Sequence, residues 1–225
     1  MAETQPRLHT WQIDAREYAR QERRRGRRHA YERLTGPSTA LVVVDMVRFF
    51  VAGNPYGLGI VPHVHTLARA VRAAGGTVAW VLPAVTEQAT GWAVDFYGPE
   101  IAELYRGAGG TGPLRSRLWP DLTPAPDDPV VEKTAASAFF PGRCALRDHL
   151  DRRAVDTVLV CGLVTNVCVE STVRDAATLG YRTLLAADAC ATRDDTLHNA
   201  SLTTIYRSFG DVRPTSELLA LLATS

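Results

Sequence analysis

Residues 40–44 read Ala-Leu-Val-Val-Val and carry no polar side chain. A short β-branched run of this kind is typical of a strand covered on both faces, as in a parallel sheet. Comparable apolar runs follow at residues 77–82, 130–131, 157–162 and 182–187. Because segments with helical spacing separate most of these runs, we expect an α/β fold. The expected architecture is three-layer α/β/α, with a doubly wound, mostly parallel sheet of about six strands.

Glycine and proline mark where several of the expected helices begin and end. Pro62 is expected to open a helix that Gly75 and Gly76 end. Residues 98–128 are rich in glycine, proline and aspartate, which predicts a long surface excursion with a helical segment near residues 99–106. The main helices are expected at residues 62–74, 143–153, 168–179, 194–209 and 215–222.

Composition narrows the class of protein further. A chain of 225 residues with 46% hydrophobic and 22% charged residues suits a single globular domain. Its apolar runs are too short for a membrane span, and its polar, arginine-rich N-terminus lacks the apolar segment of a signal peptide. The four cysteines form no CxxC pair, so a zinc ribbon is not expected. We therefore expect a cytoplasmic protein with reduced thiols and no membrane partner.

The first 36 residues differ in composition from the rest. Residues 1–36 contain nine arginines and five acidic residues, and a rough helical spacing predicts a basic helical arm joined to one domain at residues 37–225. The arginines at residues 23–28 resemble a nucleic-acid contact. However, acids are interleaved and the net charge is only +1, which favours a solvated face or a subunit contact. We expect no nucleic-acid partner.

Three residues whose side chains could take part in catalysis follow separate strands. Asp45 follows residues 40–44, Lys133 follows residues 130–131, and Cys168 opens a helix beyond residues 157–162. Lys133 is also the single lysine among 25 basic residues. In an open parallel sheet ligands bind at the carboxyl ends of the strands, so we expect these three side chains to lie together.

Their chemistry is that of a nucleophilic cysteine. A thiol at a helix N-terminus and near an ammonium group is expected to favour its thiolate form. A carboxylate within reach can accept the thiol proton and later return it to a leaving amine. Each residue alone has an ordinary explanation: Asp45 as a turn former, Lys133 as a surface residue and Cys168 as a buried thiol. The convergence of all three favours a catalytic site.

Around these residues the sequence resembles the isochorismatase-like cysteine hydrolase superfamily. The resemblance extends over about residues 38–220 and indicates that residues 37–225 are one hydrolase domain. It implies a catalytic triad of Asp45, Lys133 and Cys168. The matching stretches are Leu41-Val-Val-Val-Asp45-Met46, Val131-Glu-Lys133-Thr-Ala-Ala-Ser137-Ala-Phe-Phe140 and Val160-Cys-Gly-Leu-Val-Thr165-Asn-Val-Cys168-Val-Glu-Ser-Thr-Val-Arg174-Asp-Ala176.

The resemblance also implies local geometry and assembly. A non-proline cis peptide is expected between Val164 and Thr165, and the backbone amides of Thr165 and Cys168 are expected to form an oxyanion hole. Family members are usually homodimers or homotetramers, so a homo-oligomer is expected here. Phe50, Trp92, Tyr97, Phe139 and Asn166 are candidate contacts for a small-molecule substrate.

The segments at residues 137–140 and 165–168 are most similar to the amidohydrolase branch. That branch implies cleavage of a carboxamide, ureido, carbamoyl or lactam C–N bond through a thioester, without a cofactor. The Asp-x-His motif of the nicotinamidases is absent, and His63 and His65 do not share a helix face, so no metal is expected.

Two alternatives remain open from the sequence. One is vinyl ether hydrolysis of the isochorismatase type, with Asp45 as the acid and Cys168 dispensable. The other is a non-catalytic interaction protein that acts through its N-terminal arm.

Overall fold

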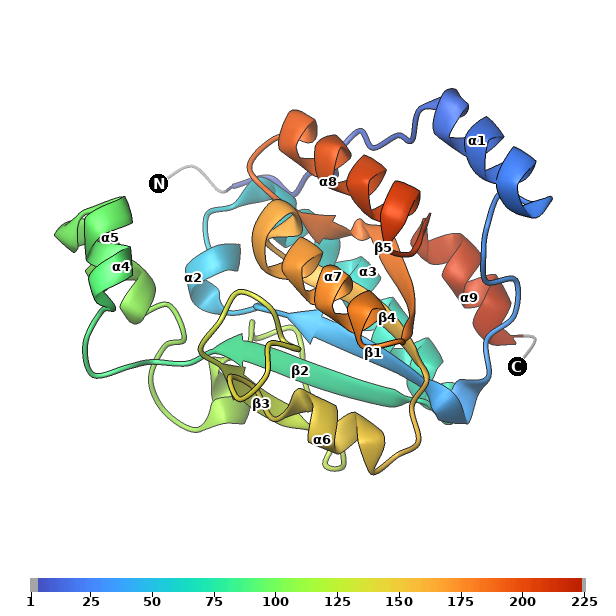
Figure 1. Cartoon of the computed structure of the whole chain (residues 1–225). Helices are drawn as coiled ribbons and strands as arrows, with labels where there is room; N and C mark the ends of the chain where they lie inside the picture. The colour runs from blue at the N-terminus through green and yellow to red at the C-terminus, as the bar shows by residue number, and fades with distance from the viewer. Residues whose placement is uncertain (1–3, 224–225) are drawn as a thin grey trace.

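The computed structural model describes residues 4–223, and its centre is one six-stranded sheet (Figure 1). The strand order is β3-β2-β1-β4-β5-β6, and every pairing is parallel. This confirms the three-layer, doubly wound architecture, including a sixth strand that no apolar run had marked. The strands are β1 Thr39–Val44, β2 Thr77–Pro83, β3 Val130–Lys133, β4 Thr157–Leu163, β5 Arg182–Ala191 and β6 Asp211–Arg213.

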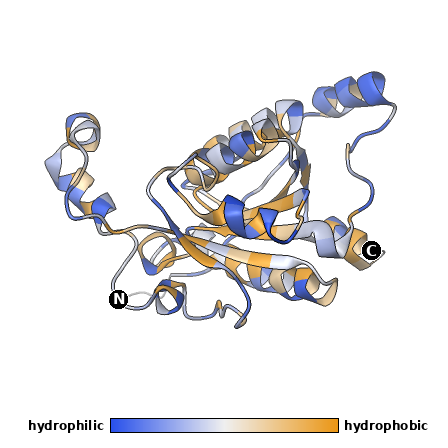
Figure 2. Ribbon diagram, turned by 60° about the horizontal axis from the view of Figure 1, so that its bottom comes forward, coloured by the Kyte–Doolittle hydropathy of each residue, from blue (hydrophilic) through white to orange (hydrophobic). Residues whose placement is uncertain are grey.

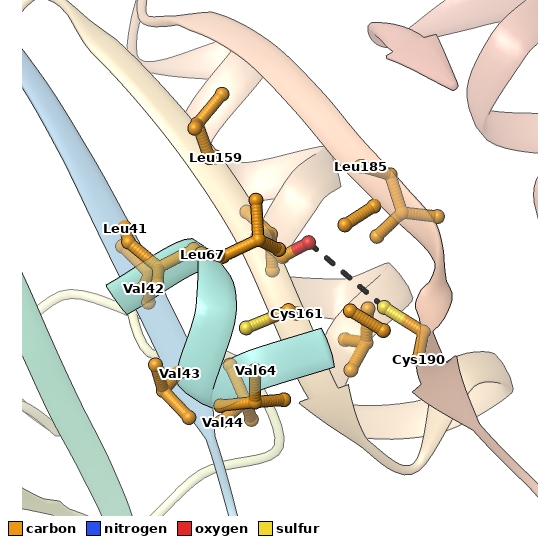
Figure 3. Packing of buried hydrophobic residues seen from close by; sticks show 14 of the residues in the cluster. Leu41, Val42, Val43, Val44, Val64, Leu67, Leu159, Cys161, Leu185 and Cys190 are labelled. Carbon is orange, nitrogen blue, oxygen red and sulfur yellow. Dashed lines mark hydrogen bonds between the residues drawn. The ribbon is translucent and has the colours of Figure 1, made fainter. Parts of the chain in front are cut away.

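The sheet is the hydrophobic centre of the molecule. Every residue of β1 is buried, as the apolar run predicts. Figure 3 shows its side chains packing beside Val64 and Leu67 of helix α3, with Leu159 and Cys161 of β4 close by. Figure 2 shows the same division, with hydrophobic strands inside and hydrophilic residues on the outer helices.

Helices cover both faces of the sheet. Helices α3 (Pro55–Ala73) and α9 (Thr215–Ala223) lie on one face (Figure 1). Helices α6 (Leu146–Asp151), α7 (Glu170–Thr178) and α8 (Asp195–Ser208) lie on the other. The strand order reverses between β1 and β4, and in such sheets the ligand site lies at the reversal.

Helix α3 begins earlier than the sequence suggests. The prediction that Pro62 opens the helix is wrong, because Pro62 lies inside it. Pro55 occupies the first turn, and the Asn54 side chain accepts hydrogen bonds from the backbone amides of Tyr56 and Gly57. A proline in the first turn and an asparagine cap together form a stronger start signal than a proline alone.

Other boundaries also differ. The helix expected at residues 143–153 shortens to α6, and the one expected from residue 168 divides into a π-type turn at Thr165–Val169 and helix α7. The excursion carries the expected helix α5 (Pro99–Arg106), preceded by α4 (Gly91–Tyr97). Shorter elements are α2 at Arg48–Val51 and 3₁₀ turns at Gly36–Ser38 and Leu114–Arg117.

The N-terminal arm contains one helix rather than a continuous helical pattern. Helix α1 (Ala15–Arg25) is capped by Asp14 and ends at Gly26, which has a φ of 76°. Residues 4–14 precede this helix without regular structure. Within residues 4–223, no helix combines the length and apolar character needed to cross a membrane.

Candidate active site

Asp45 lies directly after β1 and is fully buried. Its backbone amide donates to the Val81 carbonyl of β2, and its own carbonyl accepts from the Val47 amide. Its φ of 54° is in the left-handed region, which turns the chain out of the sheet. The side chain is therefore held at the carboxyl edge of the central strand.

Lys133 joins the other two residues. It is the last residue of β3, and its Nζ lies 2.8 Å from Asp45 Oδ2 and 3.4 Å from Cys168 Sγ. Its Nζ also donates to the Ala135 carbonyl. The structure thus brings Asp45, Lys133 and Cys168 together, with the ammonium group contacting both partners.

Cys168 lies on the π-type turn that follows β4. The Thr172 hydroxyl of α7 donates to the Cys168 carbonyl at 2.6 Å and accepts from the Ala138 amide at 3.1 Å, which ties the turn to the loop after β3. Gly162 brings β4 close to β1, because a side chain there would collide with the Val44 carbonyl.

One expectation for this turn is wrong by one bond. The cis peptide expected between Val164 and Thr165 lies instead between Leu163 and Val164. Strand β4 continues to Leu163, one residue beyond its predicted end, so the junction between strand and turn falls at that bond.

Burial controls the protonation of the site. It raises the pKa of the Cys168 thiol to about 12; the charge of Asp45 adds to this rise, and Lys133 opposes it only in part. Burial also raises the pKa of Asp45 against the opposing charge of Lys133. For Lys133, burial lowers the pKa, but Asp45 and Cys168 outweigh it and the net shift is upward. Burial therefore opposes the expected thiolate and favours the neutral thiol until a base takes its proton.

A cavity of about 390 Å³ opens above these three residues. Its upper wall comes from the excursion, with Trp92 of α4 and Tyr105 and Arg106 of α5, while Phe50 of α2 lies on another side. Trp92 is 64% exposed and stacks on Phe96. The remaining lining residues are Pro83, Ala84, Thr86, Ala89, Thr90, Ala93, Ala102, Ala108, Thr134, Ala135, Ala136 and Arg143.

The candidate substrate contacts divide into two groups. Phe50 and Trp92 line the cavity, whereas Tyr97, Phe139 and Asn166 are not among its lining residues. Tyr97 packs edge-on against Trp92, with ring centroids 5.6 Å apart. Phe139 is buried against Tyr181. The Asn166 side chain accepts a hydrogen bond from the Thr192 hydroxyl.

Sequence reasoning did not identify two cationic residues of the lining, Arg106 and Arg143. Arg106 pairs with Glu103. Arg143 donates through Nε and Nη2 to the hydroxyl and carbonyl oxygens of Thr134. Neither arginine belongs to a motif, and their positions depend on how the excursion and the loop after β3 fold. The sequence alone therefore gave no signal for either arginine.

The histidine-containing segment at residues 63–65 lies away from the cavity. His63 lies on α3, with Nδ1 at 3.5 Å from an Asp188 carboxylate oxygen. Among residues 4–223, no group of three or more His, Cys, Asp and Glu side chains is arranged to hold a metal ion. All four cysteines are free thiols.

Comparison with known proteins identifies the family. A family model described as the isochorismatase domain matches residues 39–217. YwoC, an uncharacterized isochorismatase family protein of Bacillus subtilis, is 33% identical over 182 residues, which are 80% of this chain and 92% of YwoC. The ureidoacrylate amidohydrolase RutB of Methylobacterium radiotolerans is 32% identical over 197 residues, which are 77% of this chain and 75% of RutB.

The fold has a solved counterpart. A crystal structure of a cysteine hydrolase from Pseudomonas syringae pv. phaseolicola superposes with a TM-score of 0.74 at 30% identity, covering 87% of this chain and 97% of that one. Fold and family model together define a hydrolase with a parallel α/β sheet, and Asp45, Lys133 and Cys168 lie at the carboxyl edge of that sheet. The chain belongs to the isochorismatase family.

Proposed function

We propose that the protein is a cysteine-dependent amidohydrolase that cleaves a C–N bond in a small carboxamide, ureido or carbamoyl compound, or lactam. The observation that supports this proposal is the position of Lys133, which contacts both Asp45 and Cys168 beside a cavity. A nucleophile, a carboxylate that can carry its proton and a neighbouring cation are what covalent acyl transfer requires. The similarity to RutB, a ureidoacrylate amidohydrolase, supports the same type of bond.

In the first half of the reaction, Cys168 Sγ attacks the substrate carbonyl carbon while the Asp45 carboxylate takes the thiol proton. Because the pKa of Cys168 is about 12, this transfer accompanies the attack. The raised pKa of Asp45 makes its carboxylate a stronger base. Cys168 lines the cavity, and its backbone amide holds the oxyanion, whereas the expected second donor, Thr165, is fully buried outside the lining. Asp45 then gives the proton to the leaving nitrogen, the C–N bond breaks, and a thioester to Cys168 remains.

In the second half, water attacks the thioester carbonyl and gives a proton to Asp45. The C–S bond breaks, the carboxylic acid product leaves, and the proton returns to the sulfur of Cys168. One water is consumed, and one amine and one acid are formed. Lys133 keeps its proton throughout, stabilises the developing negative charge on sulfur and orients the Asp45 carboxylate.

The lining favours a substrate with a negative charge. Within residues 4–223, Arg143 has no carboxylate within ion-pair distance, whereas Arg106 is paired with Glu103. A guanidinium group held in place by Thr134 and lacking a counter-charge suits a carboxylate. Ureido acids and N-carbamoyl acids combine such a charge with a cleavable C–N bond.

The test is a hydrolysis screen on the purified protein. The panel contains primary amides, N-carbamoyl compounds, ureido acids and lactams, and the readout is release of ammonia or amine. We expect turnover of at least one class, and a loss of at least about 10³-fold in kcat/KM for Cys168→Ala because the nucleophile is removed. Cys144→Ala, which alters the other partly exposed cysteine, is the matched control and should retain activity.

The same variant separates the alternatives. Full activity of Cys168→Ala on the panel would contradict the mechanism. Retained activity of this variant on a vinyl ether substrate would indicate isochorismatase-type chemistry with Asp45 as the acid. A non-catalytic interaction protein would hydrolyse no compound in either set.

A further inference from the structure

A histidine from the N-terminal arm lies buried near the turn that carries Cys168. His9 is only 8% exposed, although it precedes the family domain by thirty residues of chain. Its ring stacks between Tyr56 of α3 and His198 of α8, with centroids 3.9 and 4.2 Å away. The interplanar angles are 8° and 14°, so the three rings are nearly parallel.

The hydrogen bonds of His9 define its tautomer. The backbone amide of Thr192 donates to Nε2 at 3.1 Å, so Nε2 carries no hydrogen. In the neutral ring the hydrogen is then on Nδ1, which donates to Asp195 Oδ1 at 2.7 Å. This bond holds the pKa of Asp195 below its usual value. Both ring nitrogens are thus used; Thr192 directly follows β5, and Asp195 is the first residue of α8.

Two paths lead from His9 to the turn Thr165–Val169. In the first, the Thr192 hydroxyl donates to Asn166 Oδ1 at 2.6 Å. In the second, His198, which stacks on His9, has its Nδ1 at 3.0 Å from Thr165 Oγ1. His198 is fully buried, and burial lowers its pKa to about 3, so this contact keeps a neutral imidazole. Thr165 and Asn166 are the first two residues of the turn that carries Cys168.

Residues 7–12, which we call the N-terminal strap, form hydrogen bonds with α3 on one side of His9 and with α8 on the other. The Arg7 amide donates to the Pro55 carbonyl at the start of α3. Asn199 of α8 accepts from the Gln12 amide and donates to the Thr10 carbonyl. Gly59 of α3 permits this approach, since a side chain there would collide with the Arg7 carbonyl. The strap passes beside α8 in Figure 1.

We propose that His9 is a positioning residue for the reaction, holding the turn Thr165–Val169 in the conformation that presents Cys168 to the substrate carbonyl. The proposal rests on the proposed function, because it assigns the strap a part in the same site. His9 touches neither the substrate cavity nor the three catalytic side chains. Its loss should therefore lower kcat and leave KM nearly unchanged.

The decisive variant is His9→Phe, which keeps an aromatic ring in the stack and removes both hydrogen bonds. His9→Ala removes the ring as well, and His65→Ala, at an exposed position of α3, is the matched control. We expect kcat to fall about tenfold in His9→Phe and further in His9→Ala, with KM within about twofold of the wild type. Hydrogen–deuterium exchange should rise in peptides that span residues 163–170 and stay unchanged in β1.

Two results would overturn the proposal. One is wild-type exchange at residues 163–170 in both His9 variants; the other is increased exchange with kcat unchanged. The exchange measurement needs no substrate. If no compound in the panel is hydrolysed, the proposed function fails, while the exchange data still decide whether the strap holds the turn. Thermal unfolding of each variant shows that the folded protein is being compared.

Discussion

Lys133 places a positive charge where one would be costly without a partner. Its side chain is only 3% exposed, and the Asp45 carboxylate 2.8 Å away compensates the charge. Strand β2 lies between β1 and β3, so the ammonium group must reach across a spacing of about 10 Å. The sequence could single out Lys133 as the only lysine, but the reach across β2 follows from the strand order, which a linear pattern does not contain.

At this scale we predict that Lys133→Arg is as damaging as Lys133→Ala. A guanidinium group is larger and planar, with a different donor geometry, so it cannot contact Asp45 and Cys168 in the same space. We expect kcat/KM to fall by at least about 10²-fold in both variants. Arg147→Lys, an exchange at an exposed position, is the control. Near-normal turnover by Lys133→Arg would show that any cation of this length suffices.

Helices show which local signals carry most information. The sequence prediction placed the start of α3 at Pro62, but this helix opens at Pro55, which Asn54 precedes. Helix α5 was predicted, whereas α4 was not. Neither helix buries a large apolar face, since Leu104 of α5 is 54% exposed and Phe96 of α4 is 68% exposed. The π-type turn at Thr165–Val169, which carries Cys168, has no periodic pattern of apolar residues that would predict it.

The cap of α3 can be tested directly. In Asn54→Ala, the amides of Tyr56 and Gly57 lose their acceptor, and the free energy of unfolding should fall by about 1 kcal/mol. Asn54→Asp keeps the acceptor oxygen, loses only the bond from Nδ2 to the Phe50 carbonyl, and should lose less stability than Asn54→Ala. Urea denaturation followed by circular dichroism measures both variants. An equal loss in the two would mean that the side-chain oxygen is not what stabilises the helix start.

Across the whole molecule, alternation of strands and helices was enough to predict the architecture, but not how the N-terminal arm returns to it. Asp211 of β6 is fully buried and accepts hydrogen bonds from the Ala30 and Tyr31 amides. Arg25 and Arg213 lie within 3.7 Å of its carboxylate oxygens. The contacts of Asp211 with Arg25, Ala30 and Tyr31 join residues about 180 positions apart, and nothing in either segment alone indicates its partner.

The Asp211 carboxylate is the buried charge among the contacts that hold the arm on β6. Asp211→Asn removes the negative charge that two arginines face, and breaking a buried ion pair of this kind costs about 3–5 kcal/mol. We expect the free energy of unfolding to fall by about 3 kcal/mol in a urea titration. Asp127→Asn, at an exposed aspartate, should change it by less than about 0.5 kcal/mol. Similar losses in the two variants would mean that the Asp211 pairs do not hold the arm.

The three residues at the sheet edge and the residues of the upper cavity wall come from different parts of the chain. Asp45, Lys133 and Cys168 come from the ends of buried strands and the turn after β4, while Trp92, Tyr105 and Arg106 come from α4 and α5, which project away from the sheet (Figure 1). Under the proposed function, bond cleavage and substrate choice are therefore encoded in different stretches of the gene. Insertions, deletions or grafts between residues 84 and 110 can diversify the compounds accepted without repacking the interior, which makes this stretch the natural target for directed evolution.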